Sequence, residues 1–173
     1  MASFFSRCAR VLRHRWTDEA AVHRVLPPAV LEGLTRRVAA SERRHSGEVR
    51  ICVEAGLPAS YLWRDAPARE RAVMQFGKLR VWDTEHNNGV LIYLLVPEHA
   101  IEIVADRGLA RSVAPGEWEA LVSQLAVHLR EGRYEEGLAQ AVDAVSARQA
   151  AHFPRRGAGT AYANELPDAP VVR

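Results

Sequence analysis

Two short polar segments hold most of the side chains in this sequence that could do chemistry. Residues 83–89 precede an apolar run, and residues 106–108 follow the next one. Carboxylate and amide oxygens from such segments are the ligands that hard divalent cations prefer. We therefore predict a site for Ca²⁺ or Mg²⁺ with these ligands: Asp83, Glu85, Asn88 and Asp106.

Two further residues in these segments are candidates for catalysis. His86 stands among carboxylates and can act as a general acid or base. Arg107 can orient a phosphate group. Thr84 has no clear partner base, so the loop contains no obvious activated nucleophile. A purely structural role stays open as well, because Asn and Gly tolerate the positive φ of turns.

A β-hairpin is the element that would bring the two polar segments together. Residues 90–96 form a nearly continuous apolar run, which is typical of a strand buried on both faces. Residues 97–99 form a tight turn, and residues 100–105 form the return strand, which the short connection makes antiparallel. The start of the first strand and the end of the second then lie side by side at one edge of the sheet.

The surrounding pattern predicts an α/β fold. Residues 48–54 alternate polar and apolar side chains, which indicates a strand with one buried face. Residues 68–82 have helical periodicity and lie between this strand and the hairpin, which favours parallel pairing with a right-handed crossover. The prediction is a small mixed β-sheet, with a parallel crossover plus an antiparallel hairpin, flanked by helices. One of these helices opens at Pro27–Pro28 and is expected to end near Gly47 in a left-handed cap.

Chain length suggests one domain with two tails. The 173 residues divide into a basic N-terminal segment (1–27), an α/β domain (28–154) and a flexible C-terminal tail (155–173). Docking of residues 166–172 on the domain is the alternative for the tail. The net charge of only +2, and basic patches without interleaved aromatics, argue against a nucleic-acid partner. Nucleotide-binding glycine loops and a nucleophile elbow are also missing from the sequence.

The N-terminal segment combines arginines with large apolar side chains. Residues 1–16 contain four arginines interspersed with Phe4, Phe5, Val11, Leu12 and Trp16. As a helix, this segment could lie on an anionic membrane surface; a basic terminus that packs a few apolar groups is the alternative. The sequence shows neither a secretory signal nor an apolar run of about 20 residues. We therefore expect a cytoplasmic protein, with a candidate peripheral contact to the inner membrane face.

The order of motifs resembles the TPM-domain family. The likeness covers residues 28–154 and rests mainly on Asn87-Asn88-Gly89 before the first hairpin strand and Asp106-Arg107-Gly108 after the second. That family includes a thylakoid-lumen acid phosphatase and a photosystem II repair protein, and bacterial members are often encoded near LemA-type proteins. The resemblance implies an α/β sandwich, divalent-cation binding and, in some members, phosphatase activity. The Leu-Ala-Arg-Ser continuation after Gly108 departs from the Gly-rich, acidic continuation of many secreted members.

These observations lead to three expectations for function, the third of which is a structural cation-binding module. The first is a binding or accessory module for a membrane-associated assembly, with a divalent-cation site and with a LemA-type neighbour as candidate partner by family resemblance. The second is a metal-assisted, phosphatase-like hydrolase that uses His86 and Arg107. The missing nucleophile favours the first.

Overall fold

A four-stranded mixed sheet forms the centre of the molecule. The structure, a computed structural model, describes residues 4–155 and 164–173. The strands are β1 (Val49–Glu54), β2 (Val90–Leu95), β3 (Ala100–Ala105) and β4 (Val171–Val172), in the order β3-β2-β1-β4. β1 pairs in parallel with β2 and β4, whereas β2 and β3 form the antiparallel hairpin. The predicted parallel crossover and hairpin are both confirmed.

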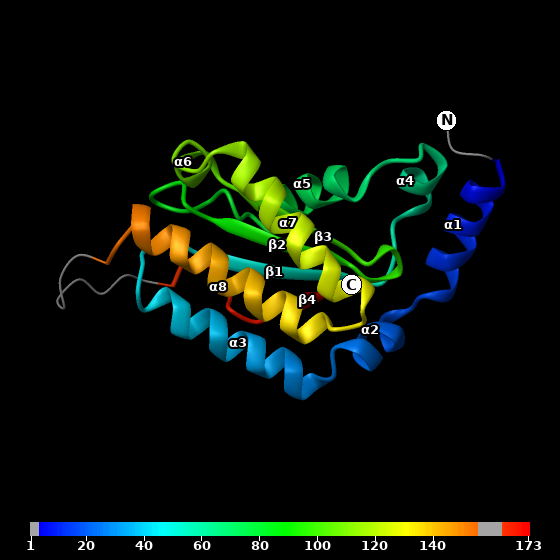
Figure 1. Cartoon of the computed structure of the whole chain (residues 1–173), viewed down its shortest axis with the longest axis horizontal. Coiled ribbons are helices and arrows are strands. Elements are labelled where there is room, and N and C mark those ends of the chain that lie inside the picture. Colours follow the sequence, from blue (N-terminus) through cyan, green and yellow to red (C-terminus); the bar gives the residue numbers. More distant parts are fainter. Residues whose placement is uncertain (1–3, 156–163) are drawn as a thin grey trace.

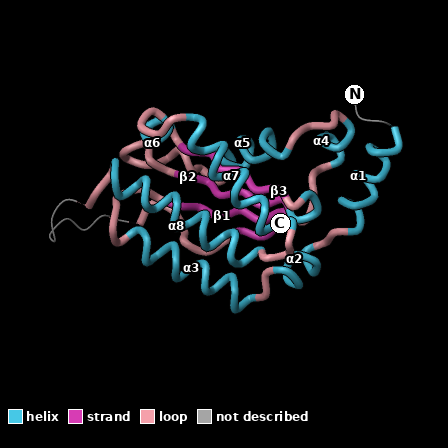
Figure 2. Tube along the Cα trace, in the orientation of Figure 1, coloured by secondary structure: helices cyan, strands magenta, loops and turns pink. Residues whose placement is uncertain are grey.

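Helices surround this sheet on both faces (Figure 1, Figure 2). They are α1 (Phe4–Trp16), α2 (Glu19–Val25), α3 (Pro28–Glu42), α4 (Ala59–Trp63), α5 (Ala68–Lys78), α6 (Arg107–Ala110), α7 (Pro115–Arg130) and α8 (Tyr134–His152), with a short 3₁₀ turn, η1 (Val96–Glu98), inside the hairpin. Within the described residues, no helix has the length and apolar character to cross a membrane.

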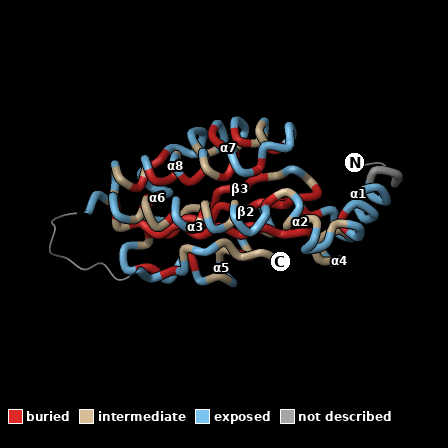
Figure 3. Tube along the Cα trace, turned by 90° about the horizontal axis from the view of Figure 1, so that it is seen from below, coloured by how far each residue is buried: buried red, intermediate tan, exposed pale blue. Residues whose placement is uncertain are grey.

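The side chains of each strand point alternately to the two faces of the sheet, and a hydrophobic core lies on each face. Ile51 and Ile92 face the larger core, which α3, α7 and α8 cover. Cys52 and Tyr93 face the smaller core beneath α5. Figure 3 shows α7 and α8 on one side of the sheet and α5 on the other, with the buried residues between them. Because successive residues of a strand point to opposite faces, each strand contributes side chains to both cores.

The expectation of one buried face on β1 was wrong. All six residues of this strand are buried. The polar side chains tolerate burial because they are hydrogen-bonded. Arg50, for example, donates to the backbone carbonyls of Pro167 and Ala169.

Gly47 also differs from the prediction. Helix α3 ends at Glu42, and among the described glycines only Gly132 has a positive φ. A Cβ on Gly47 would lie 2.4 Å from Nε2 of Gln149. The backbone at Gly47 lies against the buried Gln149 side chain of α8, so a larger residue would require this side chain to move.

Both ends of the domain extend beyond residues 28–154. Val22 and Leu26 are fully buried in the larger core, so the fold includes α2. At the other end, Leu166 is buried in the smaller core and β4 pairs with β1. Residues 164–173 are therefore docked on the domain, as the alternative prediction for the tail proposed.

Candidate functional site

The loop of residues 83–89 and the start of α6 meet at one end of the hairpin. Asp106 donates its backbone N–H to the Gly89 carbonyl, and Gly108 donates to the Asn87 carbonyl, each at 2.8 Å. The Arg107 Nε also donates to the Asn87 side-chain oxygen at 2.8 Å. The two polar segments are thus joined by both backbone and side-chain hydrogen bonds.

Two glycines permit close backbone packing here: Gly108 lets α6 approach the loop, and Gly89 lets the loop pack against Val81. A Cβ on Gly89 would lie 2.0 Å from the Val81 carbonyl oxygen, and one on Gly108 would lie 2.5 Å from the Asn87 carbonyl oxygen. Asn87 itself has a φ of 52°, a conformation that Asn adopts more readily than most residues. The Asn-Asn-Gly and Asp-Arg-Gly borders therefore have a steric explanation.

Asn88 anchors the loop to the rest of the domain. The residue is 1% exposed, and its side-chain amide donates to the Ser46 carbonyl at 3.0 Å. Its backbone N–H donates to the Thr84 hydroxyl, and its carbonyl accepts from the Gln149 side chain. Loss of such buried partners is costly, so this side chain has a clear structural role.

Two of the three carboxylates predicted as metal ligands, Asp83 and Asp106, have separate local partners. Asp83 pairs with Arg80 at 3.3 Å, and one oxygen of Asp106 accepts the Arg107 backbone N–H at 2.7 Å. The other Asp106 oxygen is buried without a hydrogen-bond partner among the described residues.

Within residues 4–155 and 164–173, no three His, Cys, Asp or Glu side chains are grouped closely enough to hold a metal ion. Asp83, Glu85 and Asp106 therefore do not form one donor set in this conformation. The unpaired Asp106 oxygen is a feature that fits a cation, and the metal site stays a prediction.

A polar hollow of about 580 Å³ lies beside this loop. Its walls combine the loop with the end of α8 and the residues that follow α3: Ser46, Glu85, His86, Asn87, His152, Phe153 and Pro154. Imidazole and carboxylate side chains are the groups that general acid–base catalysis most often uses. Arg107 does not line the hollow. The contribution of His152 was missed in the sequence because it is 66 positions from His86 and becomes a neighbour only through folding.

A second missed group is a buried polar cluster on β1. Glu54, which is 2% exposed, accepts hydrogen bonds from Arg71 Nε at 2.7 Å, from the Tyr93 hydroxyl at 2.6 Å and from the Gln75 amide at 2.5 Å. Burial and the nearby Glu54 charge raise the pKa of Tyr93. These hydrogen bonds fix α5 to the sheet, while the side-chain oxygen of Gln75 is buried without a hydrogen-bond partner among the described residues. The i, i+4 spacing of Arg71 and Gln75 was the only available sequence signal.

A third group surrounds the start of β1. Glu42 accepts the Val49 backbone N–H at 3.0 Å, and burial raises its pKa to about 8. Glu48 accepts backbone N–H groups from Glu165 and Leu166, and burial raises its pKa too. These carboxyl groups hold the C-terminal segment against the strand.

Comparison with known proteins places this fold. A family model described as the TPM domain matches residues 18–148. The solution structure of the BA42 protein from the psychrophilic bacterium Bizionia argentinensis is similar, with a TM-score of 0.73 and 22% identity, over 86% of this chain and 95% of that chain. The N-terminal domain of a protein from P. gingivalis is similar with a TM-score of 0.58 and 22% identity, over 77% of this chain and 83% of that chain.

The comparison with curated proteins gave no match. The two solved structures share the fold, and the family model spans most of the sequence, including α2, the hairpin and the greater part of α8. On this evidence, the chain belongs to the TPM domain family.

Proposed function

We propose that the protein is a noncatalytic accessory module that attaches to an anionic membrane surface through α1 and α4. The observation that carries this proposal is a set of exposed large apolar side chains on these two helices. Trp16 is 77% exposed and Trp63 is 87% exposed. Val11 and Leu12 on α1 are about half exposed as well. Exposed apolar groups gathered at one place are typical of an interaction surface.

Val11, Leu12 and Trp63 line one hollow at an end of the molecule. The helices α1 and α4 lie together, at the opposite end from α6 (Figure 1). Between them is an open apolar hollow of about 650 Å³, lined by Arg7, Cys8, Val11, Leu12, Leu62 and Trp63. We call this surface, together with Trp16, the α1–α4 face. Phe4 and Phe5 were also expected to contribute, and their side chains lie outside the described part of the structure.

Charge on α1 complements an anionic surface. The helix contains arginines at positions 7, 10, 13 and 15 and no acidic residue. Arg7, Arg13 and Arg15 are exposed. Basic groups beside apolar ones favour attachment at lipid headgroups, with about 1 kcal/mol for each Lys or Arg near the surface.

Buried contacts hold α1 in a fixed position on the domain. His14 is buried; its Nδ1 accepts the Leu57 backbone N–H at 3.0 Å, and its Nε2 contacts Glu98 at 2.8 Å. Arg10 bonds to Glu98 at 2.6 Å and to Asp65 at 2.8 Å. The α1–α4 face is therefore preformed, and binding would require little ordering of the helix.

Vesicle co-sedimentation of the full-length protein tests the proposal. We expect binding to vesicles of phosphatidylglycerol, weaker binding to phosphatidylcholine, and release at high salt because screening weakens surface charge interactions. The double variant Leu12→Ser, Trp63→Ser should lose most of the binding. The matched control is Val73→Ser, Val127→Ser, which removes exposed apolar groups from α5 and α7 and should bind as the wild type does. Equal binding of both variants would contradict the proposal.

A LemA-type protein is the partner class proposed from family resemblance. The resemblance supports an assembly at the membrane, which is compatible with attachment through α1 and α4. Pull-down of a purified LemA-type protein with the full-length protein on vesicles would test this part separately, and no retention would reject it.

A second candidate function is hydrolysis of a phosphate ester with a divalent cation. The hollow beside His86 and His152, and the unpaired oxygen of Asp106, support it. If a cation binds, Ca²⁺ or Mg²⁺ should raise the melting temperature of the wild type, because a ligand specific to the folded state stabilises it. Asp106→Asn should remove this shift, and His86→Gln should reduce turnover of a generic aryl phosphate. No thermal shift and no turnover would reject the candidate.

A further inference from the structure

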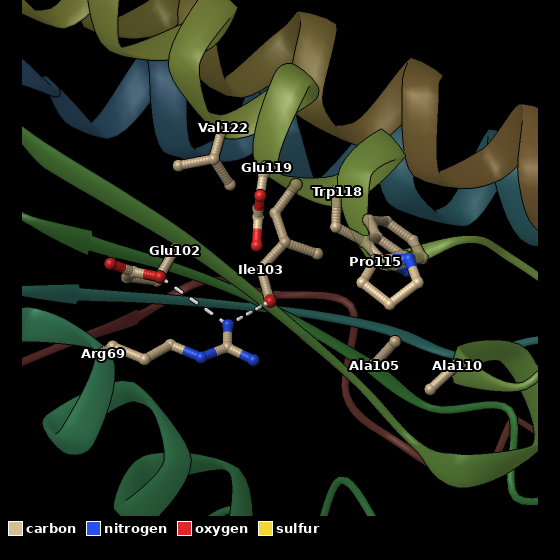
Figure 4. A pocket seen from close by; sticks show the side chains of 9 residues that line it. All are labelled: Arg69, Glu102, Ile103, Ala105, Ala110, Pro115, Trp118, Glu119 and Val122. Atoms are coloured by element: carbon tan, nitrogen blue, oxygen red, sulfur yellow. Dashed lines mark hydrogen bonds and ion pairs between the residues drawn. The ribbon is translucent and has the colours of Figure 1, made fainter.

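The outer edge of β3, one of the two edge strands of the sheet, lies at the floor of a groove between α5 and α7 (Figure 4). The groove has a volume of about 410 Å³, which is in the range of known ligand pockets. It is lined by Arg69, Glu102, Ile103, Ala105, Ala110, Pro115, Trp118, Glu119 and Val122. The α1–α4 face contributes none of these residues, so the groove is a separate feature.

The backbone of β3 presents hydrogen-bonding groups toward this groove. Asp106 donates its N–H to the Gly89 carbonyl of the neighbouring strand end. Because inward and outward groups alternate along an antiparallel edge, Val104 also bonds to β2. The N–H and C=O groups of Ile103 and Ala105 then point away from β2. Such an edge is a template for one more strand.

Arg69 covers this edge at present. Its guanidinium donates to the Ile103 carbonyl at 2.5 Å, which is the position that the N–H of an added strand would take. The same side chain pairs with Glu102 at 3.6 Å and is 51% exposed. Ile103 is buried beneath it. A half-exposed arginine can swing away into solvent while keeping its ion pair, so the cover is removable.

The wall formed by α7 supplies further recognition groups. The indole Nε1 of Trp118 is buried and has no acceptor among the described residues. Glu119 is exposed at the same wall and forms no ion pair with a described residue. Val122 and Pro115 add apolar surface. This combination suits an extended backbone with a basic side chain, since an unpaired carboxylate favours a positive partner.

We propose that the β3 groove binds an extended peptide of a protein partner, which adds as a strand to Ile103 and Ala105 and places a Lys or Arg against Glu119. The peptide displaces Arg69 from the Ile103 carbonyl. Main-chain hydrogen bonds provide the affinity, and Glu119 provides the preference for a basic side chain.

The experiment selects peptides of about ten residues from an unbiased phage library on the full-length protein, then measures their affinities by fluorescence anisotropy. Ala105→Pro removes one outward N–H and leaves the bonds to β2, because proline is tolerated on edge strands. Selected peptides should bind this variant about tenfold more weakly and Arg69→Ala more tightly. Glu119→Lys should abolish the preference for basic peptides, while the control Gln124→Lys, exposed on the same helix outside the groove, should keep it.

Three results would overturn the proposal. The first is that the wild type retains no more peptide than the Ala105→Pro variant does. The second is equal affinity of selected peptides for the wild type and Glu119→Lys, which would put binding elsewhere. The third is a dimer in light scattering that Ala105→Pro removes, which would assign the edge to a second copy of the chain. If Ala105→Pro melts early, the affinities of Arg69→Ala and Glu119→Lys decide instead.

Discussion

Gly89 is the position in the Asn-Asn-Gly loop where a side chain would clash most severely. A Cβ there would lie 2.0 Å from the Val81 carbonyl oxygen, and backbone atoms cannot yield as a flexible side chain can. We expect Gly89→Ala to lower the free energy of unfolding by about 2–4 kcal/mol. The matched control is Gly33→Ala in the interior of α3, where no atom beyond the adjacent backbone of the helix lies within 4 Å of the new Cβ.

Gly33→Ala should raise stability by about 0.5–1 kcal/mol, because alanine is the better helix former. Urea unfolding of both variants provides the comparison. Equal effects of the two substitutions would show that the loop does not need a glycine at position 89.

His45 makes stability depend on pH. It is 1% exposed, its Nδ1 contacts the Gly47 carbonyl at 3.0 Å, and burial lowers its pKa to about 4. The unfolded chain then binds more protons than the folded one between pH 4 and an ordinary histidine pKa of about 6.5. Its contribution to stability is therefore complete above about pH 6.5 and is lost as the pH falls toward 4.

The expected loss is about 3 kcal/mol over this range. Glu42 acts with the opposite sign: its raised pKa, about 8, gives a contribution that is complete below about pH 4.5 and is lost as the pH rises through 8. The difference between wild type and His45→Asn, measured by urea unfolding from pH 4 to 8, isolates the histidine. A difference that does not change with pH would contradict this account.

At the scale of elements, the C-terminal segment that contains β4 covers the smaller core, and its deletion tests this role. It pairs with β1 beside Cys52, and Leu166 packs in the same core as that thiol. We expect deletion of residues 164–173 to lower stability by roughly 2–4 kcal/mol and to expose Cys52 to a thiol reagent. A Cys8→Ser background removes the exposed cysteine, so the reagent reports on Cys52 alone. An unchanged reaction rate would show that the segment does not protect this core.

Sequence periodicity identified the elements whose pattern is local. The apolar run of β2 and the short turn before β3 were enough to predict the hairpin, and the helix before them predicted the parallel crossover. The two-residue strand β4 and the buried second face of β1 were not predictable, because both depend on contacts that form only on folding. Cys52 pairs with Val171 in β4, and Glu54 bonds to Arg71 on α5. At the candidate site, the meeting of Asn87 with Arg107 follows from the hairpin, whereas the approach of His152 depends on how α8 packs.

At the scale of the whole molecule, the α1–α4 face is separated from the hairpin end that holds the hollow beside His86. Figure 1 shows α1 and α4 at the opposite end from α6. Attachment through α1 would leave that hollow and the β3 groove accessible to a partner. This arrangement suits a module that brings another protein to a membrane.

Fluorescence of single-tryptophan proteins on vesicles tests the central claim most directly. Two full-length proteins each keep one half-exposed or exposed tryptophan, Trp63 or Trp82, with phenylalanine at the other three tryptophan positions. With phosphatidylglycerol vesicles that contain brominated acyl chains, we expect emission from Trp63 to shift to the blue and to be quenched, because its ring enters the headgroup region. Emission from Trp82 should not change. An unchanged Trp63 signal, or equal quenching of both residues, would contradict attachment through the α1–α4 face.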